Sequence, residues 1–367
     1  MKILQLSALW EDVPPKTYGG TELVVYNLCE GLIRQGHEVL LIAPKESKTS
    51  AKIVSPVKKP LREMGTNIPF FYEDMAISMA IEESAKYDIV HNHLGLPVLP
   101  FHNLFKCPMV TTLHGAFVVK EETKAFQFYK NLPYISISNS QRKGNPSLNY
   151  VSTVYNGIDV NKFEFRSEPD TNNPYLAYLG RISPEKGAHH AIRLARETGW
   201  KLIIAAKVDG KDVDYYEKEI KPCIDNKQIV FIGEVDHVGK ENLLKNAHAL
   251  IHAVTWPEPF GLTMVESMAC GTPVLALNMG SIPEVINHGV TGYVEETIEG
   301  LINRVKDIDK IDRYACRKHV VENFSDIRMV ENYLQTYQKV IETGKHPSLT
   351  VKSERTKAKK NTKSPLH

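Results

Sequence analysis

The chain has 367 residues, of which 24% are charged and 42% hydrophobic. This composition is typical of a globular protein long enough for two domains. The formal net charge is only +2 at pH 7, so no overall charge bias indicates nucleic-acid binding. The five cysteines form no C-x-x-C pair, and no apolar run approaches the roughly 18 residues needed to cross a membrane. We therefore expect a cytoplasmic protein with reduced thiols rather than a disulfide-rich or membrane-spanning chain.

Short apolar runs alternate with segments of helical period along most of the chain. Several of these runs carry little polar alternation, which is typical of parallel strands covered on both faces. In the first half we expect strands at 2–8, 37–43, 87–93, 108–114, 134–138 and 151–156. In the second half we expect them at 175–180, 201–207, 228–233, 248–254, 272–277 and 291–294.

Helical patterns lie between these runs, for example at 22–35 and 186–198. This alternation predicts two parallel-sheet α/β domains. A polar, Asn- and Pro-rich stretch at 161–174 interrupts it and marks the domain boundary. An amphipathic helix is expected at 325–342, followed from residue 345 by a tail rich in Lys and Arg. We expect this tail to be disordered, with peripheral contact to an anionic membrane surface as an alternative.

The first predicted strand leads into PPKTYGGTE, in which Gly19 and Gly20 directly precede a helical pattern. Two interpretations stay open for this pair: an ordinary turn, or a loop whose backbone N–H groups approach a bound anion. Open α/β sheets bind ligands beyond the carboxyl ends of their strands, so two such domains face to face form a cleft. Candidate functional residues should therefore follow the strands.

The strand predicted at 175–180 leads into RISPEKG. Ser183 and Pro184 are typical of the first positions of a helix, so we expect Lys186 in its first turn. The helix dipole disfavours a cation there, and a bound anion would remove the conflict. Arg181, in the preceding loop, can reach the same anion with its planar guanidinium. The alternative is two solvated charges beside a well-capped helix.

The segment WPEPFGLTMVESMACG, after the strand predicted at 248–254, carries two carboxylates. Glu258 has a proline on either side, which keeps it in a loop. A helix is expected to begin near 261–263, where Thr263 and Glu266 have the T-x-x-E spacing of a capping box. In the functional interpretation, both carboxylates lie at the mouth of the cleft and accept hydrogen bonds from ligand hydroxyls.

Three histidines stand at the ends of predicted strands: His91 and His93 in DIVHNH, and His114 in TTLHG. The H-x-H spacing occurs in metal-dependent hydrolases, but no later strand ends in a convincing further ligand, so we expect no metal site. A hydrogen-bonded structural role is the simpler interpretation of His91 and His93, whereas His114 is expected to contact substrate. The D-x-D pair Asp212 and Asp214 precedes a helical pattern, and we expect it to lie away from these motifs.

Together these blocks resemble the retaining family-4 glycosyltransferases of the GT-B fold. The Glu-x7-Glu segment with R-x4-K upstream is the most specific match, and the PPKTYGGTE loop resembles an avilamycin-pathway subgroup. The matching stretches run in family order to about residue 294; they are YGGTE, DIVHNH, TTLHG, ISNS, VYNGID, YLGRISPEKG, VFIGEV and EPFGLTMVESMACGTPVLALNMGSIPEVINHGVTGYV.

The resemblance implies an α/β GT-B architecture, with two Rossmann-like parallel-sheet domains facing across a cleft. It implies an acceptor-side domain at 1–165 and a nucleotide-sugar donor domain at 166–324. A helix at 325–344 would cross back onto the N-terminal domain, followed by the basic tail at 345–367.

The resemblance also implies roles for the matching residues. The diphosphate would be bound by Arg181 and Lys186, and the ribose hydroxyls by Glu266. The nucleobase would lie near Gly233 and Val235. The donor sugar and phosphates would be contacted by Glu258 and by the backbone of Phe260, Gly261, Leu262 and Thr263.

On the opposite domain, His114 would lie near the sugar and the reacting carbon. Gly19 and Gly20 would approach the diphosphate as the cleft closes. The resemblance thus implies a catalytic set of His114, Arg181, Lys186 and Glu258.

Such enzymes generally need no metal for catalysis, so we expect no cofactor. The resemblance implies transfer of a hexose-like sugar, with retention, from a nucleotide-sugar donor; we favour a UDP-sugar over a GDP- or ADP-sugar. The acceptor stays open between a lipid carrier, a polysaccharide or other glycan, a small molecule and a protein, and no nucleic-acid partner is expected. Two alternatives are a metal-dependent hydrolase that uses the three histidines and a non-catalytic sugar-nucleotide-binding protein.

Overall fold

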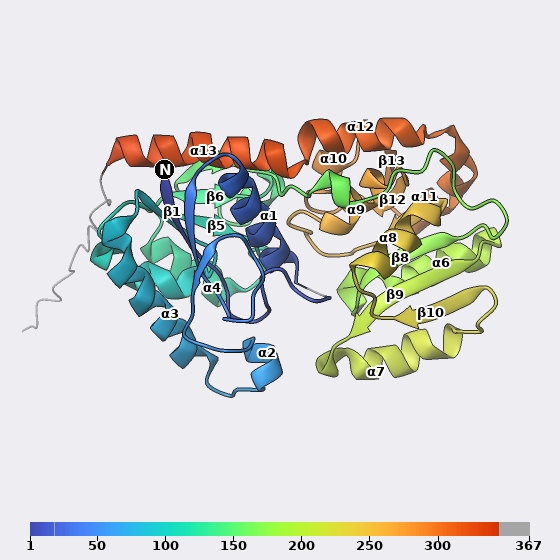
Figure 1. The fold of residues 1–367 in the computed structure, drawn as a ribbon. Coiled ribbons are helices and arrows are strands. Elements are labelled where there is room, and N and C mark those ends of the chain that lie inside the picture. The colour runs from blue at the N-terminus through green and yellow to red at the C-terminus, as the bar shows by residue number, and fades with distance from the viewer. Residues whose placement is uncertain (18, 345–367) are drawn as a thin grey trace, which may run out of the picture.

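The computed structural model describes residues 1–17 and 19–344, and it folds into two α/β halves that lie side by side (Figure 1). Each half is built on one sheet in which all paired strands are parallel. The halves face one another across a cleft, so the GT-B arrangement predicted from the sequence is confirmed.

The first sheet has seven strands in the order β3-β2-β1-β4-β5-β6-β7. Six of them coincide with predicted runs, whereas β3 was not predicted, because its KIV sequence is too short to show a period. The strands are β1 Lys2–Leu6, β2 Glu38–Ile42, β3 Lys52–Val54, β4 Ile89–Asn92, β5 Met109–Leu113, β6 Tyr134–Ser136 and β7 Tyr150–Thr153.

The second sheet has six strands in the order β10-β9-β8-β11-β12-β13, and all six were predicted. The central strand β11 is buried along its whole length, as expected for a strand with helices on both faces. The strands are β8 Leu176–Ile182, β9 Leu202–Val208, β10 Ile229–Gly233, β11 Ala249–His252, β12 Val274–Leu277 and β13 Gly292–Glu295.

Helices cover both faces of each sheet. In the first half they are α1 Gly20–Arg34, α2 Leu61–Met64, α3 Pro69–Glu83, α4 Lys120–Phe128 and α5 Asn139–Arg142. The second half contains α6 Ala188–Thr198, α7 Val213–Tyr215, α8 His237–Asn246, α9 Leu262–Ala269, α10 Ile282–Val285, α11 Ile298–Arg304 and α12 Arg313–Asn323. The last helix is α13 Asp326–Thr343.

The predicted helix start before Lys186 is wrong. Residues Pro184–Lys186 form a separate 3-10 turn, and α6 begins only at Ala188. Gly187 separates the two with a φ of +73°, where a Cβ atom would lie 1.9 Å from the carbonyl oxygen of Ala253. Ser183 therefore makes no side-chain cap to a helix, and Lys186 lies on a tight loop that only glycine can close.

Two hydrophobic layers sandwich the first sheet, because successive residues of each strand point to opposite faces. On β1, Ile3 packs with residues of α1 and α13, whereas Leu4 packs with residues of α3. Helix α13 leaves the second half and runs back over the first (Figure 1). It buries Tyr333 and Tyr337 completely against that sheet, so the predicted crossing helix is confirmed.

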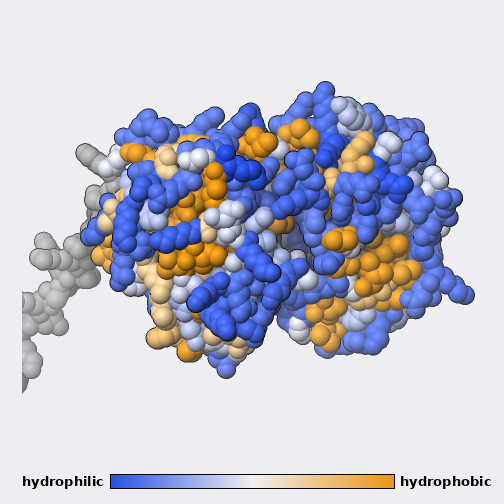
Figure 2. All heavy atoms as spheres, in the orientation of Figure 1, coloured by the Kyte–Doolittle hydropathy of each residue, from blue (hydrophilic) through white to orange (hydrophobic). Residues whose placement is uncertain are grey.

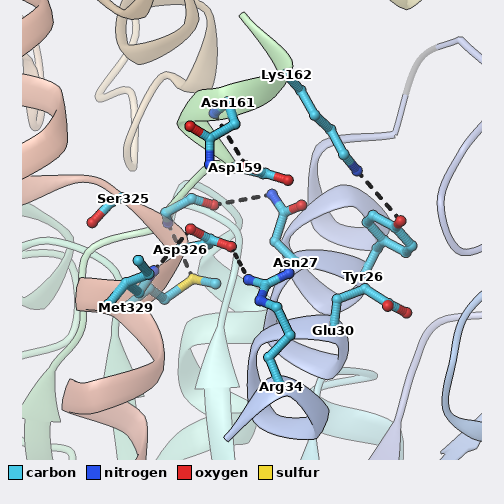
Figure 3. Close-up of polar contacts among 12 residues, drawn as sticks. Tyr26, Asn27, Glu30, Arg34, Asp159, Asn161, Lys162, Ser325, Asp326 and Met329 are labelled. Atoms are coloured by element: carbon cyan, nitrogen blue, oxygen red, sulfur yellow. Dashed lines mark hydrogen bonds and ion pairs between the residues drawn. The ribbon is translucent and has the colours of Figure 1, made fainter.

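The chain crosses between the halves twice, near Ile158 and near Ser325, and side chains of α1 bind to both crossings (Figure 3). Ile158 of the first crossing pairs with Ser325 of the second in a short parallel bridge, with Asp326 N donating to Ile158 O at 2.8 Å. The Asn27 side chain donates to Gly157 O at 3.1 Å, and Arg34 forms an ion pair with Asp326. One helix of the first half therefore holds both crossings together.

The basic tail at 345–367, for which we expect disorder or contact with an anionic membrane surface, lies outside the described residues. Within the described part, no helix combines the length and the apolar character that a membrane span requires.

Candidate active site

Two adjoining cavities lie between the halves, where the carboxyl ends of both sheets meet, and Figure 2 shows the molecule hollowed there. The larger cavity has a volume of about 380 Å³, within the range of small-molecule sites. The smaller one has a volume of about 140 Å³. Their shared walls contain Gly19, Gly20, Leu179, Gly180, Leu262 and Thr263.

The glycine pair forms the edge of the first half at both cavities. A Cβ atom at Gly19 would lie 2.7 Å from the Pro15 side chain, so this position must be glycine. A Cβ at Gly20 would lie 3.6 Å from Leu262 of the opposite half. Gly20 is the first residue of α1, and the backbone N–H groups of a helix start lack intrahelical partners. The pair is thus both a required turn and part of the cavity wall.

Lys186 and Glu258 form an ion pair in the wall of the larger cavity. Lys186 Nζ lies 2.5 Å from Glu258 Oε2, and Trp256 Nε1 donates to the same oxygen at 2.9 Å. The ammonium also lies 4.7 Å from the centre of the Trp256 ring. Burial is the largest influence on the pKa of Glu258 and raises it, but the charges of Lys186 and His252 and the hydrogen bonds from Lys186 and Trp256 together lower the pKa below its ordinary value. The Glu258 carboxyl is therefore ionised at neutral pH.

Arg181 lines the same cavity and is surrounded by carboxylates. Its guanidinium lies 2.8 Å from Glu185, 3.7 Å from Asp209 and 3.9 Å from Asp212. The expectation that Asp212 lies away from the motifs is therefore wrong, because the chain turns back after β9 and brings it beside Arg181. These carboxylates hold the guanidinium at the cavity by electrostatic attraction.

Glu266 and Lys240 form a second buried ion pair, in the wall of the smaller cavity. Glu266 comes from α9 and Lys240 from α8, with side-chain exposures of 3% and 17%. The Thr263–Glu266 capping box is wrong: Thr263 Oγ1 contacts His252 Nδ1 at 3.4 Å instead. Glu266 thus lines the smaller cavity with Lys240 as its partner, and it does not cap its own helix.

The smaller cavity also receives Val235, but Gly233 is not among the residues that line it. Gly233 ends β10 with a φ of +77° and turns the chain toward Val235. Phe260, Gly261, Leu262 and Thr263 all line the larger cavity, where α9 begins at Leu262. The start of this helix therefore faces the same space as Lys186 and Arg181, and it favours an anion.

His114 lines the larger cavity from the first half. Burial lowers its pKa to about 4, so the ring is neutral. His91 and His93 are fully enclosed behind it and hydrogen-bond to neighbouring side chains. Because these bonds occupy both ring nitrogens of His91 and of His93, the three histidines do not converge on a common point. Within the described chain, no group of three His, Cys, Asp or Glu residues is arranged to hold a metal ion.

Sequence reasoning missed several polar groups of the cavities. Glu22 lines the larger cavity beside the glycine pair, and burial raises its pKa to about 7. The position of Glu22 within the YGGTE motif is a signal that could have identified it. Trp256 could likewise have been identified, because it stands only two residues before Glu258. Lys240 and Asp209 carry no such signal, because only the packing of α8 and the turn after β9 bring them to the site.

Family models match both halves of the chain. The model described as Glycosyltransferase Family 4 matches residues 18–162. The model described as Glycosyl transferases group 1 matches residues 159–314. Together they cover residues 18–314, which include most of the residues that line the two cavities.

Known proteins resemble the chain over most of its length. The glycosyltransferase MJ1607 of Methanocaldococcus jannaschii is 28% identical over 336 residues, covering 80% of this chain and 84% of that protein. AviGT4, described as a glycosyltransferase of avilamycin A biosynthesis, superposes with a TM-score of 0.70 at 21% identity, over 93% of this chain and 98% of its own. HepE of Anabaena, solved with UDP and glucose, has a TM-score of 0.72 at 19% identity, over 92% and 100%. The chain belongs to the family-4 glycosyltransferases of the GT-B fold.

Proposed function

We propose that this glycosyltransferase moves a hexose-like sugar from a nucleotide-diphosphate-sugar to an acceptor, with retention of the anomeric configuration. One observation carries the proposal. Two cations, Arg181 and Lys186, share a cavity with the start of α9 and with the Gly19-Gly20 edge, and the carboxylate of Glu266 lies in the cavity that adjoins it. A diphosphate fits the first set of groups, and ribose hydroxyls fit the carboxylate.

A UDP-sugar is the favoured donor. HepE, which shares the fold, was solved with UDP and glucose. We assign the nucleobase to the smaller cavity, which is lined by Val235, the segment 205–207 and Glu266. GDP- and ADP-sugars are the alternatives.

The charges of the larger cavity suit the chemistry of transfer. Cleavage of the anomeric C–O bond leaves positive charge on the sugar and negative charge on the diphosphate. Lys186 and Arg181 stabilise the departing diphosphate, and each well-placed charged donor contributes about 3 kcal/mol to the lowering of the barrier. The acceptor hydroxyl then bonds to the anomeric carbon on the face that the diphosphate leaves, and its proton passes to a diphosphate oxygen. This account requires neither an enzymatic nucleophile nor a metal.

The decisive experiment is a screen of UDP, GDP and ADP, and of their glucose conjugates, against the purified protein. We expect one nucleotide to raise Tm far more than the other two, because a ligand that binds only the native state stabilises it. The conjugate of that nucleotide should be hydrolysed slowly when no acceptor is present. With a simple alcohol as acceptor, NMR of the glycoside formed, which unlike free glucose does not mutarotate, should show the anomeric configuration of the donor. EDTA should leave the rate unchanged.

The other outcomes separate the alternatives. Stabilisation without any hydrolysis or transfer would point to a non-catalytic sugar-nucleotide-binding protein. Loss of activity with EDTA and its recovery with a divalent ion would overturn the metal-free account. An inverted product would contradict retention while leaving the donor assignment in place.

A further inference from the structure

A buried chain of hydrogen bonds connects the crossing helix α13 to His114 at the cavity. Its members come from β1, β4, β5 and α13, and they lie on the face of the first sheet that α13 covers. Gln5 and His91 are paired in register on neighbouring strands, and Tyr337 of α13 contacts both. His93, one step further along, reaches His114. The sequence alone did not identify hydrogen-bond partners for His91 and His93, and this series of hydrogen bonds identifies them.

Each contact in this series lies within hydrogen-bond distance. Gln5 Nε2 donates to the Tyr337 hydroxyl at 3.1 Å, and Gln5 Oε1 lies 2.7 Å from His93 Nε2. His93 Nδ1 lies 2.8 Å from His114 Nε2. At the other end, the Tyr337 hydroxyl lies 2.6 Å from His91 Nδ1, and His91 Nε2 lies 2.7 Å from Thr112 Oγ1.

The contacts assign the protons once the direction at Tyr337 is known. The 2.6 Å separation from His91 Nδ1 is typical of an O–H donor, so Tyr337 donates to His91 and accepts from the Gln5 amide nitrogen. The Gln5 amide oxygen must then accept from His93, which places the His93 proton on Nε2. A neutral imidazole carries one donor and one acceptor, so His93 Nδ1 accepts and His114 Nε2 donates to it.

We propose that Tyr337, Gln5 and His93 hold His114 in the tautomer protonated at Nε2, so that its Nδ1 presents a lone pair to the cavity and accepts a hydrogen bond from a donor-sugar hydroxyl. The fixed tautomer of His114 is a property of the protein alone, whereas the contact with the sugar hydroxyl rests on the proposed function. Tyr337, Gln5 and His93 are positioning residues, since they act on the cavity through His114.

The burial of these hydrogen-bonded residues supports a fixed tautomer of His114. Gln5, His91 and Tyr337 have no exposed surface, and His93 is 5% exposed, so water does not compete for their hydrogen bonds. Burial lowers the pKa of His91 and His93 well below the ordinary value, so both rings are neutral. Among the described residues, Nδ1 of His114 has no hydrogen-bond partner, and the residue lines the larger cavity.

The tautomer can be measured directly in protein labelled with 15N-histidine, using long-range 1H–15N correlations of the ring nitrogens. The His114→Asn variant identifies the His114 signals. In the wild type we expect His114 to carry its proton on Nε2. Rotation of the Gln5 amide by half a turn would reverse every bond in the chain, so a proton on Nδ1 overturns the proposal, whatever the variants do.

Two variants test the dependence on the chain. Gln5→Met keeps the approximate side-chain volume but loses both contacts, and Tyr337→Phe loses only the hydroxyl. In each we expect a mixture of His114 tautomers and a fall in transfer rate of about tenfold, with the Kd for UDP unchanged because UDP lacks the sugar. Unchanged tautomers in both folded variants would overturn the role of the chain.

Tyr333→Phe is the matched control. Tyr333 is one turn away on α13, equally buried, and its hydroxyl contacts Thr112 at 3.2 Å, beyond His91 at the far end of the chain. We expect it to leave the His114 tautomer and the rate within about twofold of the wild type. If the tautomers shift as expected but the wild type transfers no sugar, the proposed function fails and the hydrogen-bonded chain stands.

Discussion

Lys186 Nζ lies 2.5 Å from Glu258 Oε2, and the two side chains are only 18% and 8% exposed. The pair joins the loop after β8 to the loop after β11, and Trp256 contacts both partners. A buried cation needs such a partner, because charge removed from water without one is strongly destabilising. Glu258 thus holds the Lys186 side chain in place at the cavity.

Replacing Lys186 with alanine should lower kcat/KM for the donor by one to three orders of magnitude, or roughly 1.5–4 kcal/mol of transition-state stabilisation. Arg181→Ala should have an effect in the same range. Initial rates at subsaturating donor measure both. The matched control is Lys245→Ala, which breaks an ion pair with Glu164 on the same half, away from the cavities. Near-normal rates for both Lys186→Ala and Arg181→Ala would contradict the proposal that these two residues bind the diphosphate of the donor.

Glu266→Gln should raise the Kd for the preferred nucleotide by about 5- to 100-fold, because a carboxylate accepts strong hydrogen bonds from hydroxyls. The wild type should also discriminate against the 2′-deoxynucleotide, whereas the variant should bind both forms alike. Isothermal titration with the two nucleotides tests this. Equal discrimination in the variant and in the wild type would place the ribose elsewhere.

Glu22→Gln should stabilise the protein at pH 8 but hardly at pH 4.5. Burial raises the pKa of Glu22 from 4.5 to about 7, so the native state holds a proton that the unfolded state has already lost. The free energy of unfolding therefore falls as the pH rises from about 4.5 to 7 and then levels off, and glutamine removes this loss. The upper bound is about 3 kcal/mol, since the N-terminus of α1 favours the ionised form. Denaturant titrations at the two pH values measure the difference, and an equal effect at both would contradict the raised pKa.

Arg34→Ala should destabilise the contact between α1 and the second crossing. Asp326 is 7% exposed and forms its ion pair with Arg34. Burial already raises the pKa of Asp326, and loss of the guanidinium should raise it further. We therefore expect a loss of about 1–3 kcal/mol at pH 7 and a smaller loss below about pH 3, where the carboxyl is protonated in both states.

The matched control for the crossing is Arg328→Ala. Arg328 is paired with Glu331 on the exposed side of the same helix α13, so its loss should change the free energy of unfolding by less than about 0.5 kcal/mol. Chemical denaturation of both variants compares the two pairs. Equal losses would show that the ion pair of Arg34 has no special weight at the crossing.

Local patterns predicted most of the fold. Parallel strands such as β8 and β11 are near-continuous apolar runs, so they are visible without any partner. The start of α6 was placed wrongly, because Ser183 and Pro184 suit a helix start locally. The close approach of Gly187 to Ala253 imposes a tight turn there instead, and Ala253 follows a different strand.

In the candidate site, too, some features follow from local sequence patterns and others depend on the folded structure. Local sequence patterns indicate which residue types follow which strands. They therefore predict that Arg181, Lys186, Glu258 and His114 lie near a cleft, because the carboxyl ends of parallel strands share one edge. The partners of the site residues become apparent only in the folded protein: Asp212 lies beside Arg181, Lys240 beside Glu266, and Tyr337 behind His93 through Gln5. These contacts join residues far apart in the chain, and buried polar groups find such partners through packing, which no local period encodes.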